Sequence, residues 1–157
     1  MSFFDSFSQK HLVFDGGMGT MLQAAGLPAG ASPDVWNITN PDAVRAVHAA
    51  YLNAGANVIT STTFGSTQPR QKRGAYKPAE LAAAGVRIVK DAITASGKTA
   101  YAALDIGPLG EFLEPLGDLT EEEATAYFRE EIESGVAAGA DCILIETMSA
   151  LDEALLC

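Results

Sequence analysis

The sequence predicts an α/β fold of the (β/α)8 barrel (TIM-barrel) type, with about the first four βα units present. Four short apolar runs recur at nearly even intervals, each interval about the length of one βα unit. The segments between them carry helical patterns, and the unbroken apolar runs indicate parallel strands buried on both faces. Each run ends in a polar residue: Leu12–Asp15, Val58–Thr62, Ala102–Asp105 and Ile143–Glu146.

Three helices are expected between these strands. The first starts at Asn40-Pro41-Asp42, where an N-cap residue precedes a proline and an acid, and it stops at Gly55. The second runs from about Pro78 to Ala95. The third opens with a capping box, Thr120 with Glu123, and continues to about residue 139, while a last helix begins near residue 150.

Two of the passages from helix to strand resemble each other. Residues 54–59, Ala-Gly-Ala-Asn-Val-Ile, match residues 138–143, Ala-Gly-Ala-Asp-Cys-Ile, in residue type. In this alignment Thr62 falls opposite Glu146. A barrel built from similar modules would give such a repeat. A glycine that ends a helix before a buried strand is also common in other α/β folds.

The length predicts half of a barrel. Eight βα units need roughly 250 residues, whereas this chain has 157, so residues 1–157 are expected to form the N-terminal half of the domain. A small, complete four-stranded open sheet is the alternative. Half a barrel leaves two strand edges unpaired, which favours self-association or pairing with a missing C-terminal half-barrel.

Composition excludes several classes of function. The chain is 48% hydrophobic and 19% charged, as in an ordinary globular protein, and its net charge of −10 argues against nucleic acid and anionic membranes. The basic cluster at residues 70–73 with Lys77 is predicted to be a solvated loop, with contact to a phosphate group as the alternative. No membrane span, signal-peptide pattern or disulfide framework is evident, since Cys142 and Cys157 are the only cysteines. A cytoplasmic location is therefore expected.

Polar residues at the strand ends are the candidates for chemistry, because α/β enzymes bind ligands at that edge of the sheet. Asp15-Gly16-Gly17 opens a glycine-rich turn whose backbone N–H groups could receive an anionic group, or which could be only a tight turn. The hydroxyl-rich segment at residues 60–67 could bind a ligand or cap the turn. Glu146 follows an apolar strand and favours a ligand role. His11 and His48 lie away from this edge.

Three segments resemble the homocysteine S-methyltransferase family. They are residues 13–20 (Val-Phe-Asp-Gly-Gly-Met-Gly-Thr), residues 53–64 (Asn-Ala-Gly-Ala-Asn-Val-Ile-Thr-Ser-Thr-Thr-Phe) and residues 138–148 (Ala-Gly-Ala-Asp-Cys-Ile-Leu-Ile-Glu-Thr-Met). Residues 107–110 and 114–120 look closest to the N-terminal homocysteine-binding module of cobalamin-dependent methionine synthase. The resemblance covers nearly the whole chain from about Leu12 onward.

The resemblance implies a barrel that methylates the homocysteine thiol on zinc, giving methionine. It implies substrate contacts at seven positions: Asp15, Gly16, Gly17, Thr62, Thr63, Phe64 and Glu146. Glu146 matches the family's acid for the substrate amino group.

The resemblance also implies cofactors that this chain would not hold by itself. The family's zinc thiolates follow the sixth and eighth strands, and neither Cys142 nor Cys157 matches them. Zinc is thus expected only in the parent enzyme, with cobalamin and methyltetrahydrofolate bound by further domains. The isolated chain is expected to be inactive. The alternatives are a non-catalytic half-barrel that binds an amino acid or assembles with a partner, and an unrelated barrel enzyme. An aldolase-like barrel lacks support because no strand-end lysine is present.

Overall fold

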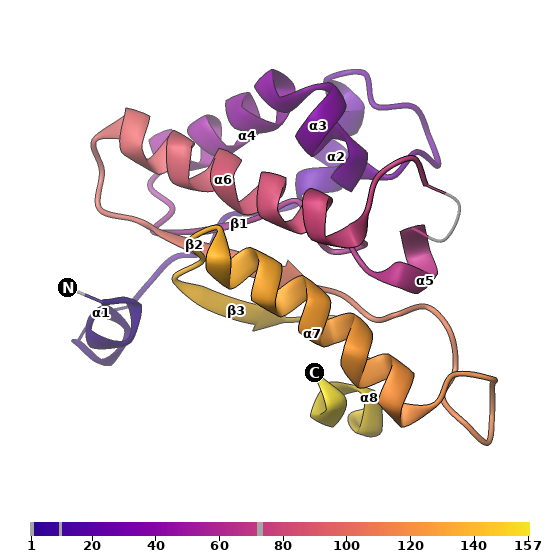
Figure 1. The fold of residues 1–157 in the computed structure, drawn as a ribbon. Helices are drawn as coiled ribbons and strands as arrows, with labels where there is room; N and C mark the ends of the chain where they lie inside the picture. Colours follow the sequence, from indigo (N-terminus) through magenta and orange to yellow (C-terminus); the bar gives the residue numbers. More distant parts are fainter. Residues whose placement is uncertain (1, 10, 72–73) are drawn as a thin grey trace.

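The computed structural model describes residues 2–9, 11–71 and 74–157. Three parallel strands form one sheet in the order β1-β2-β3, and the long helices pack beside one another over it, α4 next to α6 and α6 next to α7 (Figure 1). The strands are β1 (Val58–Thr60), β2 (Tyr101–Ile106) and β3 (Cys142–Ile145). The helices are α1 (Phe3–Gln9), α2 (Met18–Ala24), η1 (Pro33–Val35), α3 (Trp36–Thr39), α4 (Pro41–Ala54), α5 (Gln68–Gln71), α6 (Pro78–Ser96), α7 (Glu121–Ala137) and α8 (Leu151–Leu156).

The three long helices and the last short one lie where the sequence predicts them. The capping box at α7 forms: Glu123 N donates to Thr120 Oγ1 at 3.2 Å, and Thr120 N donates to Glu123 Oε2 at 3.1 Å. Asn40 precedes α4, but its side chain makes no capping hydrogen bond. The proline at the first helical position needs no N–H partner, so α4 begins there without the side-chain cap. The sequence pattern did not predict the short helices α1, α2, η1, α3 and α5.

The repeated passages share their backbone geometry. Gly55 after α4 and Gly139 after α7 have φ of 106° and 102°, the left-handed region that glycine adopts without strain. A strand follows each glycine, β1 in the first case and β3 in the second. The repeat therefore reflects two equivalent helix-to-strand turns.

The predicted first strand is not a full strand. The segment 12–15 runs parallel to β1, but its only bridge pairs Phe14 with Val58. Val13 O accepts from Val58 N at 3.1 Å, and Asp15 N donates to Val58 O at 3.0 Å. Val13 and Phe14 remain 58% and 40% exposed, so packing covers neither side of the segment well. The structure thus corrects the predicted first strand to a bridged segment at the sheet edge.

Burial on both faces holds for part of the sheet only. Every residue of β2 is buried, and β1 is nearly so. In β3 the residues alternate, with Ile143 and Ile145 41% and 42% exposed. Among the described residues β3 pairs with β2 on one side only and is the last strand of the sheet, and the face that carries Ile143 and Ile145 is largely uncovered. Within the same residues no helix has the length and apolar character of a membrane span.

The hydrophobic core lies between the sheet and its helices. Leu104 and Ile106 of β2 pack with Val86 of α6 and Phe128 of α7 in one cluster. Ile59 of β1 packs with residues of α4 and α6 in a second cluster. Burying a side chain of this size contributes about 1.5–3 kcal/mol to the stability of the fold. This packing holds the C-terminal ends of the strands together at one edge of the sheet.

Candidate functional site

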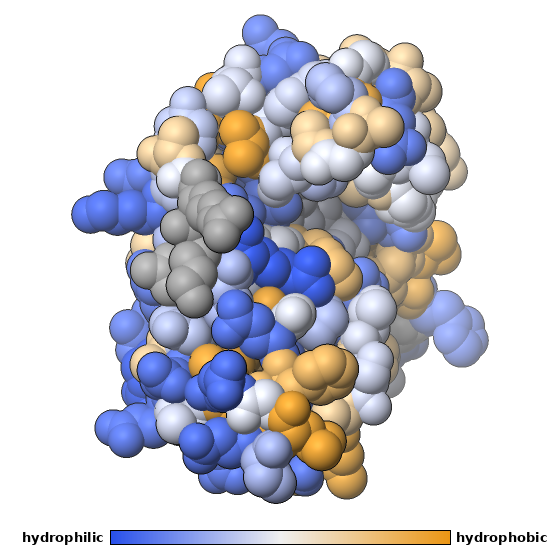
Figure 2. All heavy atoms as spheres, turned by 90° about the vertical axis from the view of Figure 1, so that its right-hand side faces the viewer, coloured by the Kyte–Doolittle hydropathy of each residue, from blue (hydrophilic) through white to orange (hydrophobic). Residues whose placement is uncertain are grey.

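A cavity of about 610 Å³ lies at the C-terminal ends of the three strands. Its wall includes the residues after β1, the end of β2 and the residue after β3, namely Ser61, Thr62, Thr63, Phe64, Asp105 and Glu146. Figure 2 views the molecule from the side toward which the strands point, and hydrophilic side chains gather in the middle of this face. The cavity therefore occupies the edge where parallel α/β folds bind ligands.

The segment after β1 is fixed by hydroxyl groups. Thr63 is fully buried, and its hydroxyl donates to Asp105 O at 2.7 Å and lies 2.8 Å from Ser61 Oγ. Thr62 O accepts from Asn37 Nδ2 at 2.7 Å, while the shielded Thr62 Oγ1 has no hydrogen-bond partner among the described residues. Thr63 thus holds the ends of β1 and β2 together, and Thr62 keeps a free hydroxyl at the cavity.

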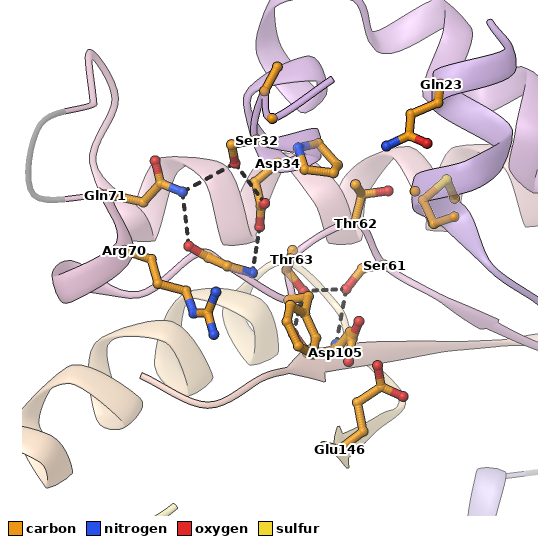
Figure 3. Close-up of a pocket in the computed structure, with 17 residues that line it drawn as sticks. Gln23, Ser32, Asp34, Ser61, Thr62, Thr63, Arg70, Gln71, Asp105 and Glu146 are labelled. Carbon is orange, nitrogen blue, oxygen red and sulfur yellow. Dashed lines mark hydrogen bonds between the residues drawn. The ribbon is translucent and has the colours of Figure 1, made fainter. Parts of the chain in front are cut away.

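Asp34 anchors the next residues of this segment. Its Oδ1 accepts from Gly65 N and Ser66 Oγ, both at 2.9 Å, and its Oδ2 accepts from Ser32 Oγ at 2.9 Å. Gln71 Nε2 donates to Gly65 O at 2.9 Å on the same side (Figure 3). Both oxygens of Asp34 are therefore occupied, which makes this buried acid a structural support for the cavity wall.

Arg70 is exposed, as predicted for a solvated segment, but it belongs to a short helix and not to a loop. It lies in α5, its Nε donates to Pro108 O at 2.6 Å, and its guanidinium carbon lies 5.4 Å from the centre of the Phe64 ring. Arg70 and Phe64 both line the cavity. The arginine follows the buried residues Ser66 and Thr67, and its side chain contacts the loop after β2 while it remains accessible to water. Lys72 and Arg73 of the predicted cluster lie outside the described residues.

Asp105 is the buried acid of the cavity. It is 7% exposed, and its Oδ1 has no hydrogen-bond partner among the described residues. Burial, and then the negative charges of Glu146, Asp34 and Asp15, raise the pKa of Asp105 to about 8. A strand-end carboxyl with a pKa in this range changes its protonation near neutral pH, which is typical of ligand sites.

Glu146 follows β3, and its backbone N donates to Ile106 O at 3.1 Å. This bond continues the β2–β3 ladder, in which Ile106 pairs with Ile145. It brings Glu146 to the end of β2, beside Asp105, and Figure 3 shows both side chains at the same edge of the sheet. Unlike Asp105, Glu146 is exposed.

The glycine-rich turn lies next to the cavity but does not line it. Asp15 Oδ1 accepts from Thr60 Oγ1 at 2.6 Å, and Oδ2 accepts from Thr60 N at 3.0 Å. Burial raises the pKa of Asp15, while the Thr60 hydrogen bonds oppose this effect. Gly16 and Gly17 are exposed just before α2, whose Met18 and Gly19 do line the cavity. The structure therefore brings Thr62, Thr63, Phe64 and Glu146 together, with Asp15, Gly16 and Gly17 beside them.

The described residues do not form a metal site. No group of three or more His, Cys, Asp or Glu side chains among them is arranged to hold a metal ion. Cys142 and Cys157 are partly buried, and burial raises the pKa of each thiol to about 11. Since zinc binds the thiolate form, both thiols are poorly suited to it at neutral pH.

Comparison with known proteins assigns the chain to a family. The model of the homocysteine S-methyltransferase family matches residues 12–157. The chain belongs to this family. The methionine synthases of Mycobacterium tuberculosis and Mycobacterium leprae are 31% and 30% identical to it over 156 residues. These alignments cover 91% of this chain and 13% of each relative, so the chain spans a small part of those proteins.

Solved structures of the family agree with the fold. The metallated form of the homocysteine methyltransferase MmuM from Escherichia coli superposes with a TM-score of 0.81 at 21% identity, over 96% of this chain and 58% of that one. The apo form gives 0.73 at 25% identity, over 99% and 54% of the two chains. The predicted family and the parallel α/β fold are thus confirmed, while the division into four barrel units stays a prediction.

The sequence signalled some of the cavity residues and not others. Asp105 was recognised as a polar strand end but was not chosen as a site residue, because nothing local separates it from a solvated acid. Asp34, Gln71 and Arg70 come from segments without a regular pattern, and only the folded chain brings them to the strand ends. Their roles depend on contacts with residues more than thirty positions away, such as Gly65 for Asp34 and Pro108 for Arg70.

Proposed function

We propose that this chain forms the homocysteine-binding part of an S-methyltransferase that methylates the homocysteine thiol and yields methionine. The observation that carries the proposal is the cavity at the strand ends, with Glu146 and Asp105 beside one another, in a chain of the homocysteine S-methyltransferase family. Homocysteine carries an ammonium group, with which a carboxylate forms a strong, charge-assisted hydrogen bond.

The substrate contacts of the proposal come from the family resemblance and agree with the geometry in part. Thr62, Thr63, Phe64 and Glu146 line the cavity. Asp15, Gly16 and Gly17 are proposed contacts that would reach the substrate from the neighbouring turn, with the exposed glycine N–H groups facing an anionic group. Phe64 supplies an apolar surface for the methylene groups of the substrate.

Activation of the thiol is the part of the reaction that the described residues do not supply. A free thiol has a pKa near 8.5 and is mostly protonated at neutral pH. Bound zinc would lower that pKa, and the family resemblance implies zinc in the parent enzyme. In this proposal other residues hold the zinc, and further domains handle cobalamin and methyltetrahydrofolate. The chain 1–157 alone would be inactive, and the cytoplasm is the proposed location.

The test is a titration of L-homocysteine into the protein at its natural full length and into its Glu146→Gln variant. Gln keeps the shape of the side chain and removes the charge, so the variant should bind roughly ten- to a hundredfold more weakly, the cost of one charge-assisted hydrogen bond. Zinc content should not change. Glu133→Gln, an exposed position on α7, is the matched control.

Equal affinities of wild type and Glu146→Gln would remove Glu146 from the substrate site. A protein that binds homocysteine but transfers no methyl group to it from any donor would support the alternative, a non-catalytic half-barrel that binds an amino acid.

A further inference from the structure

The cavity contains acidic groups that the protein itself does not neutralise. Among the described residues that line it, Asp34, Asp105 and Glu146 are acidic and Arg70 is the one base. Asp34 uses both oxygens in hydrogen bonds to Ser32, Gly65 and Ser66. Arg70 is held by Pro108 O and the Phe64 ring. The ion pairs found among the described residues include neither Asp105 nor Glu146.

Asp105 is held rigidly in place by its backbone. Its N donates to Ser61 Oγ at 3.2 Å, and its O accepts from Thr63 Oγ1 at 2.7 Å. The side chain is 7% exposed and lines the cavity, yet its Oδ1 has no partner among the described residues. Thr62 Oγ1, also shielded and without such a partner, lines the same cavity. Buried polar atoms are nearly always hydrogen-bonded, so two such atoms at one cavity point to a ligand.

Glu146 stands next to Asp105. The hydrogen bond from Glu146 N to Ile106 O places it one step beyond the end of β2, where Asp105 is the penultimate residue. Figure 3 shows the two carboxylates at this edge. We propose that Asp105 and Glu146 together bind the ammonium group of the substrate, and that Asp105 makes the site selective for a protonated amine. This inference rests on the proposed function, because the amine is that of homocysteine.

Protonation of Asp105 is expected to change when the amine binds. Burial and the nearby negative charges raise the pKa of Asp105 to about 8, so the empty site holds a neutral carboxyl near pH 7. An ammonium group favours the ionised form, so binding should release this proton. The charged groups around Asp105 are Glu146 after β3, Asp34 in η1, Asp15 before α2, Glu131 in α7 and Arg70 in α5.

The first measurement counts protons in the full-length wild-type protein. L-homocysteine and 4-mercaptobutanoate, which lacks the amino group, are titrated at pH 7 in buffers of different ionisation enthalpy. Both ligands carry a thiol, so any proton that the thiol loses on binding is counted for both. The difference in the number of protons released therefore reports the effect of the amino group. We expect homocysteine to release about one proton more than 4-mercaptobutanoate. Equal release for the two ligands would overturn the expected change in the protonation of Asp105.

The second measurement uses Asp105→Asn, with Asp91→Asn on the exposed side of α6 as the matched control. Asp105→Asn should weaken homocysteine binding by roughly ten- to a hundredfold and abolish the extra proton release, while 4-mercaptobutanoate binds as in the wild type. Wild-type affinity for homocysteine in this variant would overturn the inference and leave the proposed function standing. Failure of the wild-type protein to bind homocysteine at all would instead overturn the proposed function.

Discussion

At the residue scale, Glu131 is a fully buried acid whose pKa is raised further than that of Asp105 or Asp15. It lies in α7 with no exposed surface, and neither of its carboxylate oxygens has a hydrogen-bond partner among the described residues. Burial, followed by the charges of Asp34 and Asp105, raises the pKa of Glu131 to about 9. The folded protein therefore keeps this carboxyl neutral at pH 7, because ionising it would leave a buried charge uncompensated.

This environment makes stability depend on pH. Between the ordinary carboxyl pKa, 4.5, and about 9, the folded state binds a proton that the unfolded state has lost. The contribution of Glu131 to the free energy of unfolding is thus fully present below pH 4.5. Between pH 4.5 and about 9 it falls by about 1.4 kcal/mol per pH unit. Glu131→Gln should remove this slope. The free energy of unfolding is measured by urea titration from pH 5 to 9. Relative to the wild type, the free energy of unfolding of Glu131→Gln should increase as the pH rises.

Glu133→Gln, an exposed neighbour in α7, serves as the control and should keep the wild-type slope. Parallel curves for the wild type and Glu131→Gln would show that Glu131 titrates normally in the folded protein. The slope is the informative quantity, because any fixed cost of burying the Gln amide shifts the whole curve equally.

At the element scale, the approach of α6 to the segment after β1 shapes the cavity wall. Gly85 of α6 lies so close to this segment that a Cβ there would come within 2.6 Å of Thr63 Cγ2 and 2.9 Å of Asn37 Nδ2. Asn37 in turn donates to Thr62 O at 2.7 Å and to Leu81 O at 3.3 Å. A glycine in mid-helix is unfavourable by itself, so its presence follows from this tight packing.

Gly85→Ala should therefore destabilise the fold, although alanine is the better helix former. Overpacking of this kind costs about 1–3 kcal/mol, and the displaced Thr63 should also weaken homocysteine binding. Gly19→Ala in α2 is the matched control, because a Cβ at Gly19 meets nothing within 4 Å. Chemical denaturation of the two variants tests this. A Gly85→Ala protein at least as stable as Gly19→Ala would refute the packing argument.

At the scale of the whole molecule, the sheet leaves apolar surface uncovered at both ends. Val13 and Phe14 lie at one end, and Ile143 and Ile145 at the other, all of them at least 40% exposed. Exposed strand edges of this kind pair with other chains. The surface fits the proposal that further strands, from a second copy or a C-terminal half-barrel, complete the sheet.

The isolated chain 1–157 should therefore self-associate at micromolar concentration, which light scattering can measure. Replacing Ile143 and Ile145 by lysine should reduce the association, because charged side chains disfavour pairing at a strand edge. Val136→Lys, at an exposed apolar position of α7, should not. A stable monomer of the unmodified chain would favour a small open sheet over a half-barrel.

The sequence by itself determined the elements with strong local signals. The α7 capping box, the glycines that end α4 and α7, and the buried run of β2 depend on residues close together in the chain. Polar strand ends at regular intervals likewise located the edge that carries the cavity. Family membership followed from three motifs in the right order.

Only the tertiary structure decided how these elements meet. The segment 12–15 forms a single bridge to β1, Phe14 with Val58, and Val13 and Phe14 stay largely exposed, which the apolar pattern of this run does not reveal. Asp15 turns to Thr60, so Asp105 is the acid that lines the cavity beside Glu146. The direction of a side chain at a strand end is set by hydrogen bonds to distant residues, as Thr63 shows by bonding to Asp105 O. Local sequence patterns do not contain those partners, and for this reason the second acid appeared only in the fold.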